Sequence, residues 1–318
     1  MTGSLHHPGL GRAAPVLLAL LAVFPLAAGA LGHEYYIGFA TRVMIFAIAA
    51  SSLGLALGFG GMVSFGHAAF FGLGAYAVAI LMRHGVVSAW IAWPAATAMA
   101  ALMALAIGAV SLRTRGVYFI MITLAFAQMV YYIVLSAKAF GGDDGLTLAA
   151  RSNLGLGLDL KRDTTFYYVV LLLLAAVLFS LRRLLNARFG RVLQAIRENE
   201  TRMEAIGFPV FRYKLAAFVI AGALAGLAGA LIANQNGLVS PNLLAWPQSG
   251  WLMIMVILGG VRYLYGGALG AVVLLVLEEA LSGYTHHGQL ALGVFLLGVV
   301  LFSPDGISKW LARRSARG

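Results

Sequence analysis

Ser64 and His67 lie three positions apart in the sequence and would share one face of a helix. A serine beside a histidine can supply a nucleophile and its base, as in an intramembrane serine hydrolase. That chemistry also needs an oriented base and an oxyanion site, and no other residue clearly supplies a third member. Two further roles remain open for the pair: hydrogen bonds across helices or to freed backbone groups, and a place along a substrate path.

The segment around this pair is apolar and rich in glycine. The run FGGMVSFGHAAFFGLGAY, residues 59–76, is long enough to take part in crossing a bilayer. Membrane helices tolerate interruptions where the freed backbone lines a cavity or is satisfied by neighbours. We therefore expect a broken helix here rather than a simple anchor. Its five glycines are Gly60, Gly61, Gly66, Gly72 and Gly74.

The whole chain has the composition of a membrane protein. Its 318 residues are 61% hydrophobic and 10% charged, against about 45–50% apolar and about 25% charged in a typical soluble domain. The long apolar runs do not alternate with polar residues as the strands of a membrane β-barrel do. The sequence therefore predicts an all-α integral membrane protein, a polytopic helical bundle with one glycine-broken span.

Hydropathy and helix breaks predict about ten spans, within a single transmembrane domain over residues 1–318. The first resembles a secretory signal peptide, but the many spans downstream favour its retention as a helix. Glycines spaced along the chain, including Gly54, Gly58, Gly222, Gly226 and Gly229, predict close helix packing. The predicted spans are 13–31, 38–59, 60–82, 86–112, 116–136, 164–181, 215–236, 246–262, 267–283 and 289–303.

The distribution of charge predicts which loops face the cytoplasm. Segment 182–214 carries eight basic and three acidic residues, and basic loops remain on the cytoplasmic side. Loop 137–163 carries four of each sign and is expected outside. Counting the spans from these two loops places both termini in the cytoplasm. The formal charge of +11 thus reflects membrane topology, and no nucleic acid partner is expected.

Several chemistries have no support in the sequence. There is no cysteine, which excludes disulfides and cysteine-based metal sites, and we expect no metal site. The GxxxxGK[ST] phosphate loop, HExxH and GxSxG are all missing. No Asp or Glu lies well inside a predicted span, so the usual carboxylate relay of an ion-driven carrier is lacking. His67 keeps the ion-coupled carrier open as an alternative.

A short amphipathic helix is expected within segment 187–207. Apolar residues alternate with Arg and Glu after Gly190, and Gly207 followed by Pro209 forms a typical helix stop. Such a helix could lie on anionic lipid or dock into the groove of a cytoplasmic partner.

Five segments together resemble the permease subunits of branched-chain amino acid ABC importers, specifically the LivM-type subunits. They occur in order and cover most of the chain. They are GFGGMVSFGHAAFFGLGAY (58–76), LRTRGVYFIMITLAFAQMV (112–130), GGDDGL (141–146), FGRVLQAIRENETRMEAIGFPVFRYKLAAFVIAGALAGLAGAL (189–231) and FSPDGI (302–307). Urea importer permeases belong to the same wider family, so urea or short amides remain the alternative substrates.

The resemblance implies a permease of the bacterial cytoplasmic (inner) membrane that is not itself an enzyme. Its partners would be a second, LivH-type permease, two ATP-binding cassette subunits and a periplasmic substrate-binding protein. ATP and Mg²⁺ would bind those ATPase subunits, and no cofactor is expected on this chain. Segment 187–207 would be the coupling helix. Its candidate contacts with the ATPase are Arg191, Arg197, Glu200, Glu204, Ala205 and Gly207, of which Glu204, Ala205 and Gly207 loosely resemble the EAA loop of ABC permeases.

We expect the substrate path to follow the glycine-broken span. Freed backbone groups and the ends of half-helices can face a zwitterionic substrate. The candidate path residues are Gly60, Gly61, Ser64, Gly66 and His67, with Gln128 contributing from the fifth span. Transport would proceed by alternating access driven by the ATPases, with little substrate affinity on this subunit.

Overall fold

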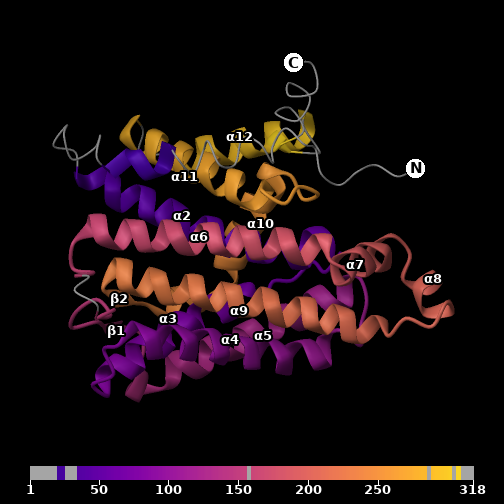
Figure 1. The fold of residues 1–318 in the computed structure, drawn as a ribbon, viewed down its shortest axis with the longest axis horizontal. Helices are drawn as coiled ribbons and strands as arrows, with labels where there is room; N and C mark the ends of the chain where they lie inside the picture. Colours follow the sequence, from indigo (N-terminus) through magenta and orange to yellow (C-terminus); the bar gives the residue numbers. More distant parts are fainter. Residues whose placement is uncertain (1–19, 26–33, 156–158, 285–287, 303–305, 309–318) are drawn as a thin grey trace.

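The computed structural model describes residues 20–25, 34–155, 159–284, 288–302 and 306–308. Within these ranges nearly all regular structure is helical, as predicted, and the helices form a bundle (Figure 1). The first half contains α2 (Glu34–Gly54), α3 (His67–Arg83), α4 (Ala89–Ser111) and α5 (Val117–Ser136). The second half contains α6 (Asp163–Asn186), α7 (Arg188–Glu198), α8 (Glu200–Ala205), α9 (Val210–Asn236), α10 (Trp246–Gly259), α11 (Gly266–Tyr284) and α12 (Gly288–Phe302).

Short elements complete the chain. A π-helical turn, Leu55–Phe59, prolongs α2, and the 3-10 helices Lys138–Phe140 (η2) and Pro241–Leu244 (η3) lie in connections. Strands β1 (Leu146–Thr147) and β2 (Leu238–Val239) pair antiparallel.

Six described helices are long and apolar enough to cross a membrane: Tyr35–Phe59, Ala89–Ser111, Val117–Ser136, Asp163–Asn186, Val210–Asn236 and Gly266–Gly283. The sequence predicted ten spans, and the difference lies in helix length. Helices α3, α10 and α12 contain 17, 14 and 15 residues, fewer than the roughly 20 that a membrane-crossing helix needs. The first predicted span, 13–31, lies largely outside the described residues, which show a helical stretch at 20–25.

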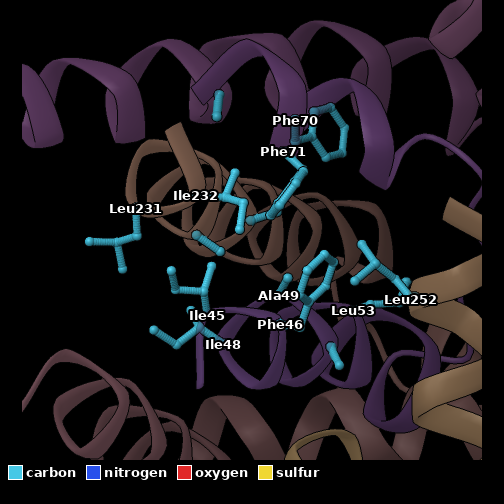
Figure 2. Close-up of a cluster of buried hydrophobic side chains, with 14 of the residues drawn as sticks. Ile45, Phe46, Ile48, Ala49, Leu53, Phe70, Phe71, Leu231, Ile232 and Leu252 are labelled. Atoms are coloured by element: carbon cyan, nitrogen blue, oxygen red, sulfur yellow. The ribbon is translucent and has the colours of Figure 1, made fainter. Parts of the chain in front are cut away.

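Helices α2 and α9 form the centre of the bundle. Figure 2 shows Ile45, Phe46 and Ile48 of α2 facing side chains of α3, α9 and α10. Lipid tails are as apolar as these side chains, so close packing rather than transfer from water holds such helices together. Glycine makes that packing possible, because a Cβ on Gly229 of α9 would overlap the Phe71 carbonyl of α3.

Three of the five glycines predicted to mediate helix packing, Gly222, Gly226 and Gly229, do so. A Cβ on Gly222 or Gly226 would overlap side chains of α4. One on Gly58 would overlap the Val261 carbonyl, whereas Gly54 has nothing within 4 Å of its hypothetical Cβ. The prediction was therefore wrong for Gly54, and Gly58 packs against the connection between α10 and α11 rather than against a helix.

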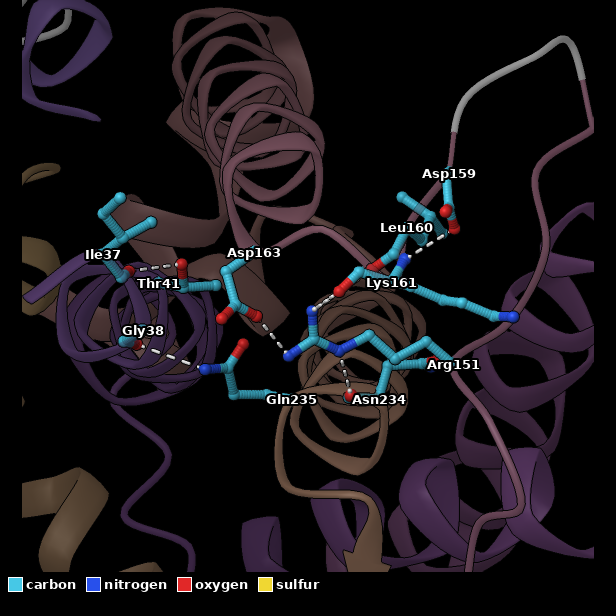
Figure 3. A network of polar contacts seen from close by, with 10 residues as sticks. All are labelled: Ile37, Gly38, Thr41, Arg151, Asp159, Leu160, Lys161, Asp163, Asn234 and Gln235. Atoms are coloured by element: carbon cyan, nitrogen blue, oxygen red, sulfur yellow. Dashed lines mark hydrogen bonds and ion pairs between the residues drawn. The ribbon is translucent and has the colours of Figure 1, made fainter. Parts of the chain in front are cut away.

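A polar network fastens the end of the bundle where α9 finishes and α6 begins (Figure 3). Arg151 pairs with Asp163 at 2.6 Å and donates through Nε to the Asn234 carbonyl at 3.1 Å. The Asn234 side-chain oxygen accepts from the Ser152 backbone N–H at 2.7 Å. The Arg151 guanidinium also lies over the Phe166 ring, 5.0 Å from its centroid. The loop is thereby tied to two long helices.

Candidate functional site

A non-helical segment, residues 60–66, separates the π-helical end of α2 from α3. We call this segment the first break. Gly61 has a φ of +67°, a left-handed conformation that glycine adopts without strain. A Cβ added there would also lie 3.1 Å from the Cγ of Arg197. Helix α3 starts at His67, so Gly60, Gly61 and Gly66 interrupt this span at its beginning, whereas Gly72 and Gly74 lie inside the continuous helix and pack closely on η3 and α9.

Two hydroxyl groups from other helices satisfy backbone groups of the first break. The Phe65 N–H donates to Thr123 Oγ1 of α5 at 3.3 Å. Ser249 Oγ of α10 accepts from the Ala68 N–H at 2.8 Å and donates to the Phe65 carbonyl at 2.6 Å. Unpaired backbone groups cost several kcal/mol in hydrocarbon, so these hydroxyls stabilise the broken conformation. Sequence reasoning missed both residues, although a lone hydroxyl within an apolar helix was the available signal.

Ser64 and His67 do not form a catalytic pair. The Ser64 hydroxyl accepts from the Gly66 N–H at 3.0 Å, which is one of the local backbone roles considered for it. His67 is fully buried, and neither ring nitrogen has a hydrogen-bond partner among the described residues. Its ring packs edge-on against Phe70 and Phe218, at centroid distances of 5.6 and 6.0 Å. The geometry gives no support to a serine hydrolase.

The other predicted path residues divide into two groups. Gly60, Gly61 and Gly66 belong to the first break, beside Ser64 and His67. Gln128 lies on α5 more than one helical turn beyond Thr123 and is half-buried. Within the described residues no hydrogen bond joins Gln128 to the break.

The predicted amphipathic segment forms two helices, α7 and α8, rather than one. Asn199 separates them and caps α8, because its side chain accepts from the Arg202 N–H at 2.9 Å. Leu193 and Ile196 are buried, which agrees with the predicted apolar ridge. Helix α8 ends before Gly207, whose φ of +86° matches the predicted stop.

Arg197 of α7 connects this segment to the first break. Its Nη1 donates to the Gly58 carbonyl at the π-helical end of α2, and its stem lies against Gly61. Partial burial lowers the pKa of Arg197 from its ordinary value, with a smaller contribution from the nearby charge of Arg262. Arginine stays charged despite such a shift, so the contact remains charge-assisted.

The remaining residues predicted for ATPase coupling have different surroundings. Glu200 contacts Lys214 of α9 at 2.5 Å and Arg115 at 3.5 Å, and Glu204 contacts Arg115 at 2.9 Å. These pairs join α8 to the beginnings of α5 and α9. The other three residues predicted for this role, Arg191, Ala205 and Gly207, are exposed.

The profile of the family described as branched-chain amino acid transport system, permease component, matches residues 35–303. The chain belongs to this permease family. It is the permease component of a branched-chain amino acid ABC transport system and is not itself an ATPase. Membership of this family and the six candidate spans together show that it is a multi-pass membrane protein.

Similar curated proteins include the LivM permeases of the high-affinity branched-chain amino acid transport systems of Salmonella typhimurium and Escherichia coli (strain K12). Each is 30% identical over 292 residues, which is 84% of this chain and 68% of the relative. The LivH permease of Salmonella typhimurium is 28% identical over 123 residues, 38% of this chain and 40% of its own. No solved structure is significantly similar to this permease. The LivM resemblance stated from the sequence is confirmed.

Proposed function

We propose that this permease carries branched-chain amino acids across the bacterial cytoplasmic membrane by alternating access, and that the first break is part of the path. The observation that supports this most directly is the contact of Arg197 with Gly58 and Gly61. A helix outside the apolar spans is thereby joined to the interruption inside them. If an ATPase subunit binds α7 and moves it, this contact would transmit the movement directly to the first break.

The proposed assembly contains a second, LivH-type permease, two ATPase subunits and a periplasmic binding protein. The curated relatives include both LivM and LivH permeases, which supports a pair of related membrane subunits. Helices α7 and α8 would dock on the ATPases, with Arg191, Ala205 and Gly207 on the exposed surface. Arg197, Glu200 and Glu204 would act on the opposite side, where they hold α7 and α8 against the membrane helices.

We infer ten crossings, with both termini in the cytoplasm. Helix α3 has 17 residues, about 26 Å at a rise of about 1.5 Å per residue. The first break supplies the remaining length of a hydrocarbon core of about 30 Å. Helix α10 is similarly prolonged by residues 237–245. On this topology α7 and α8 are cytoplasmic and loop 137–163 is external, as the loop charges predict.

Uptake into proteoliposomes that contain the permease and its four partner subunits tests the proposal. We expect leucine, isoleucine or valine to enter only with ATP and the binding protein. Uptake of urea or a short amide instead would favour the alternative substrate class. Uptake that needs no ATPase and collapses with the ion gradient would favour a secondary carrier and contradict the proposal.

A further inference from the structure

The sequence of the first break recurs later in the chain. The tetrapeptide Gly61-Met62-Val63-Ser64 is matched by Gly237-Leu238-Val239-Ser240. Both glycines have a φ of +67°. Both serines accept a hydrogen bond from the N–H two residues on, Ser64 from Gly66 at 3.0 Å and Ser240 from Asn242 at 3.3 Å. Sequence, backbone and side chain therefore repeat together.

The helices around the two tetrapeptides repeat as well. Each follows a long helix, α2 with its π-helical end or α9, and each precedes a short one, α3 or α10. The stretch from the left-handed glycine to the end of the short helix has the same length in both, Gly61 to Arg83 and Gly237 to Gly259. The unit thus comprises a long helix, a break and a short helix.

The two units are inverted relative to each other, and the long helix of each unit packs among the later helices of the other unit. The Gln235 side chain near the end of α9 donates to the Gly38 carbonyl near the start of α2, so the long helices run antiparallel. Figure 1 shows indigo α2 among the golden helices α10, α11 and α12, and orange α9 among the purple helices α3, α4 and α5. Each long helix therefore packs with the later helices of the other unit.

Small residues mark equivalent crossings in the two halves. Gly226 of α9 lies against Ala100 of α4, where an added Cβ would overlap the alanine side chain. Gly267 of α11 lies against Ala50 of α2, 2.7 Å from its carbonyl carbon to the hypothetical Cβ. In each half, the long helix of one unit thus packs closely against the second helix after the break of the other unit: α9 against α4, and α2 against α11.

Residues 237–245, which we call the second break, lie at the end of the bundle opposite α7 (Figure 1). Arg197 of α7 holds the first break. Strand β1 holds the second, through the pairs Leu146 with Val239 and Thr147 with Leu238. Each break therefore has its own support, and the two supports lie at opposite ends of the bundle.

Each break also contacts the short helix of the other unit. Ser249, near the start of α10, hydrogen-bonds with Phe65 and Ala68 of the first unit. Leu244 of the second break packs against Gly72 of α3, where an added Cβ would collide with it. A displacement of either break therefore acts on the short helix that follows the other break.

We propose that the second break is a further part of the translocation path, related to the first by an inverted repeat, and that the two breaks open in turn at opposite faces of the membrane. This inference rests on the proposed import function and adds a second gate to it. Two inverted units with discontinuous helices can supply an inner gate and an outer gate of matching structure. When the two units exchange conformations, the gate at one face of the membrane closes as the gate at the other face opens.

Thiol labelling tests the proposal directly, because the chain contains no cysteine. Val63→Cys and Val239→Cys place single thiols at equivalent positions of the two breaks. Arg113→Cys and Lys161→Cys are controls on exposed residues outside the breaks, one from the loop between α4 and α5 and one from the loop before α6. Each variant is assembled with its partners, checked for import, and reacted with a water-soluble maleimide before and after ATP is trapped on the ATPases.

We expect ATP trapping to change the two break labelling rates in opposite directions, by up to about a hundredfold for a population shift from 1:99 to 99:1, and to leave both controls unchanged. Response of Val63→Cys alone, or changes of the same sign at both breaks, would overturn the second gate while leaving the importer intact. An assembly that neither imports nor depends on ATP would instead contradict the proposed function, and the second gate with it.

Discussion

The two breaks have similar tetrapeptides but differ in what holds them. The first is held by side chains: the Thr123 and Ser249 hydroxyls inside the bundle, and Arg197, whose helix lies outside the apolar spans, beside the exposed Gly61. The second is fastened by backbone pairing with β1, next to the loop that Arg151 ties to α6 and α9. The difference indicates an adjustable end, where movement enters, and a braced end, which needs a stable scaffold. Variants that loosen one end or the other test this comparison.

The largest effect is expected at the braced end, from Arg151→Ala. Its side chain is 19% exposed, pairs with Asp163 and donates to the Asn234 and Leu160 carbonyls. Removing it leaves these acceptors without their donor, at a cost of about 2–3 kcal/mol. We expect a clear fall in the thermal unfolding temperature in detergent. Asp163→Asn is the matched control and should cost less than about 1 kcal/mol, because that carboxylate is 53% exposed. Equal losses from both variants would show that the ion pair, rather than the carbonyl contacts, braces this end.

Ser249→Ala tests the contact between α10, which follows the second break, and the first break. The hydroxyl serves both the Ala68 N–H and the Phe65 carbonyl, so its loss leaves two buried backbone groups without this partner, at about 1–3 kcal/mol. We expect reduced stability together with reduced coupling between the thiol labelling of Val63→Cys and Val239→Cys. Ser282→Ala removes an exposed serine bonded to the Glu279 carbonyl of its own helix and should change neither quantity. An unaltered labelling response in Ser249→Ala would show that the breaks communicate by another route.

Arg197→Lys addresses the adjustable end. Lysine keeps the charge and the aliphatic stem that packs on Gly61, but it lacks the planar guanidinium whose Nη1 donates to the Gly58 carbonyl, so this bond is weakened. We expect substrate uptake to fall by roughly tenfold, equivalent to about 1.4 kcal/mol, while the assembly forms and hydrolyses ATP. Arg182→Lys, at an exposed position near the end of α6, is the matched control. Parallel losses of uptake and hydrolysis in Arg197→Lys would indicate a docking role rather than transmission to the break.

The limits of prediction follow from the range over which each interaction acts. Hydropathy located the helices because burial in lipid constrains every apolar run, and glycines 60, 61 and 66 located the first break because left-handed or crowded backbone needs them. Thr123 and Ser249 were missed because their partners lie far away in sequence. The second break escaped notice because only three residues of a tetrapeptide are identical, and the shared φ of the glycines and the serine turns become visible in three dimensions.

His67→Ala gives a smaller predicted effect on the first break. Because the imidazole makes no hydrogen bond among the described residues and packs on Phe70 and Phe218, its removal should leave assembly intact. If it lines the path, uptake should fall several-fold, by roughly 1 kcal/mol. His67→Phe preserves the ring packing but not the ring nitrogens, and separates shape from polarity. Full uptake by a well-expressed His67→Ala permease would remove this residue from the path.

The smallest effect is expected from Glu204→Gln, which breaks the pair between α8 and the start of α5. Arg115 is 61% exposed and Glu204 46% exposed, so solvent screens the attraction and the pair contributes less than about 0.5 kcal/mol. The loss should disappear at high salt. Glu200→Gln should cost somewhat more, because Glu200 and its partner Lys214 are only 24% and 15% exposed. Thermal unfolding of both variants at low and high salt measures the difference. A larger, salt-independent loss in Glu204→Gln would mean that α8 braces the adjustable end more firmly than its exposed contacts indicate.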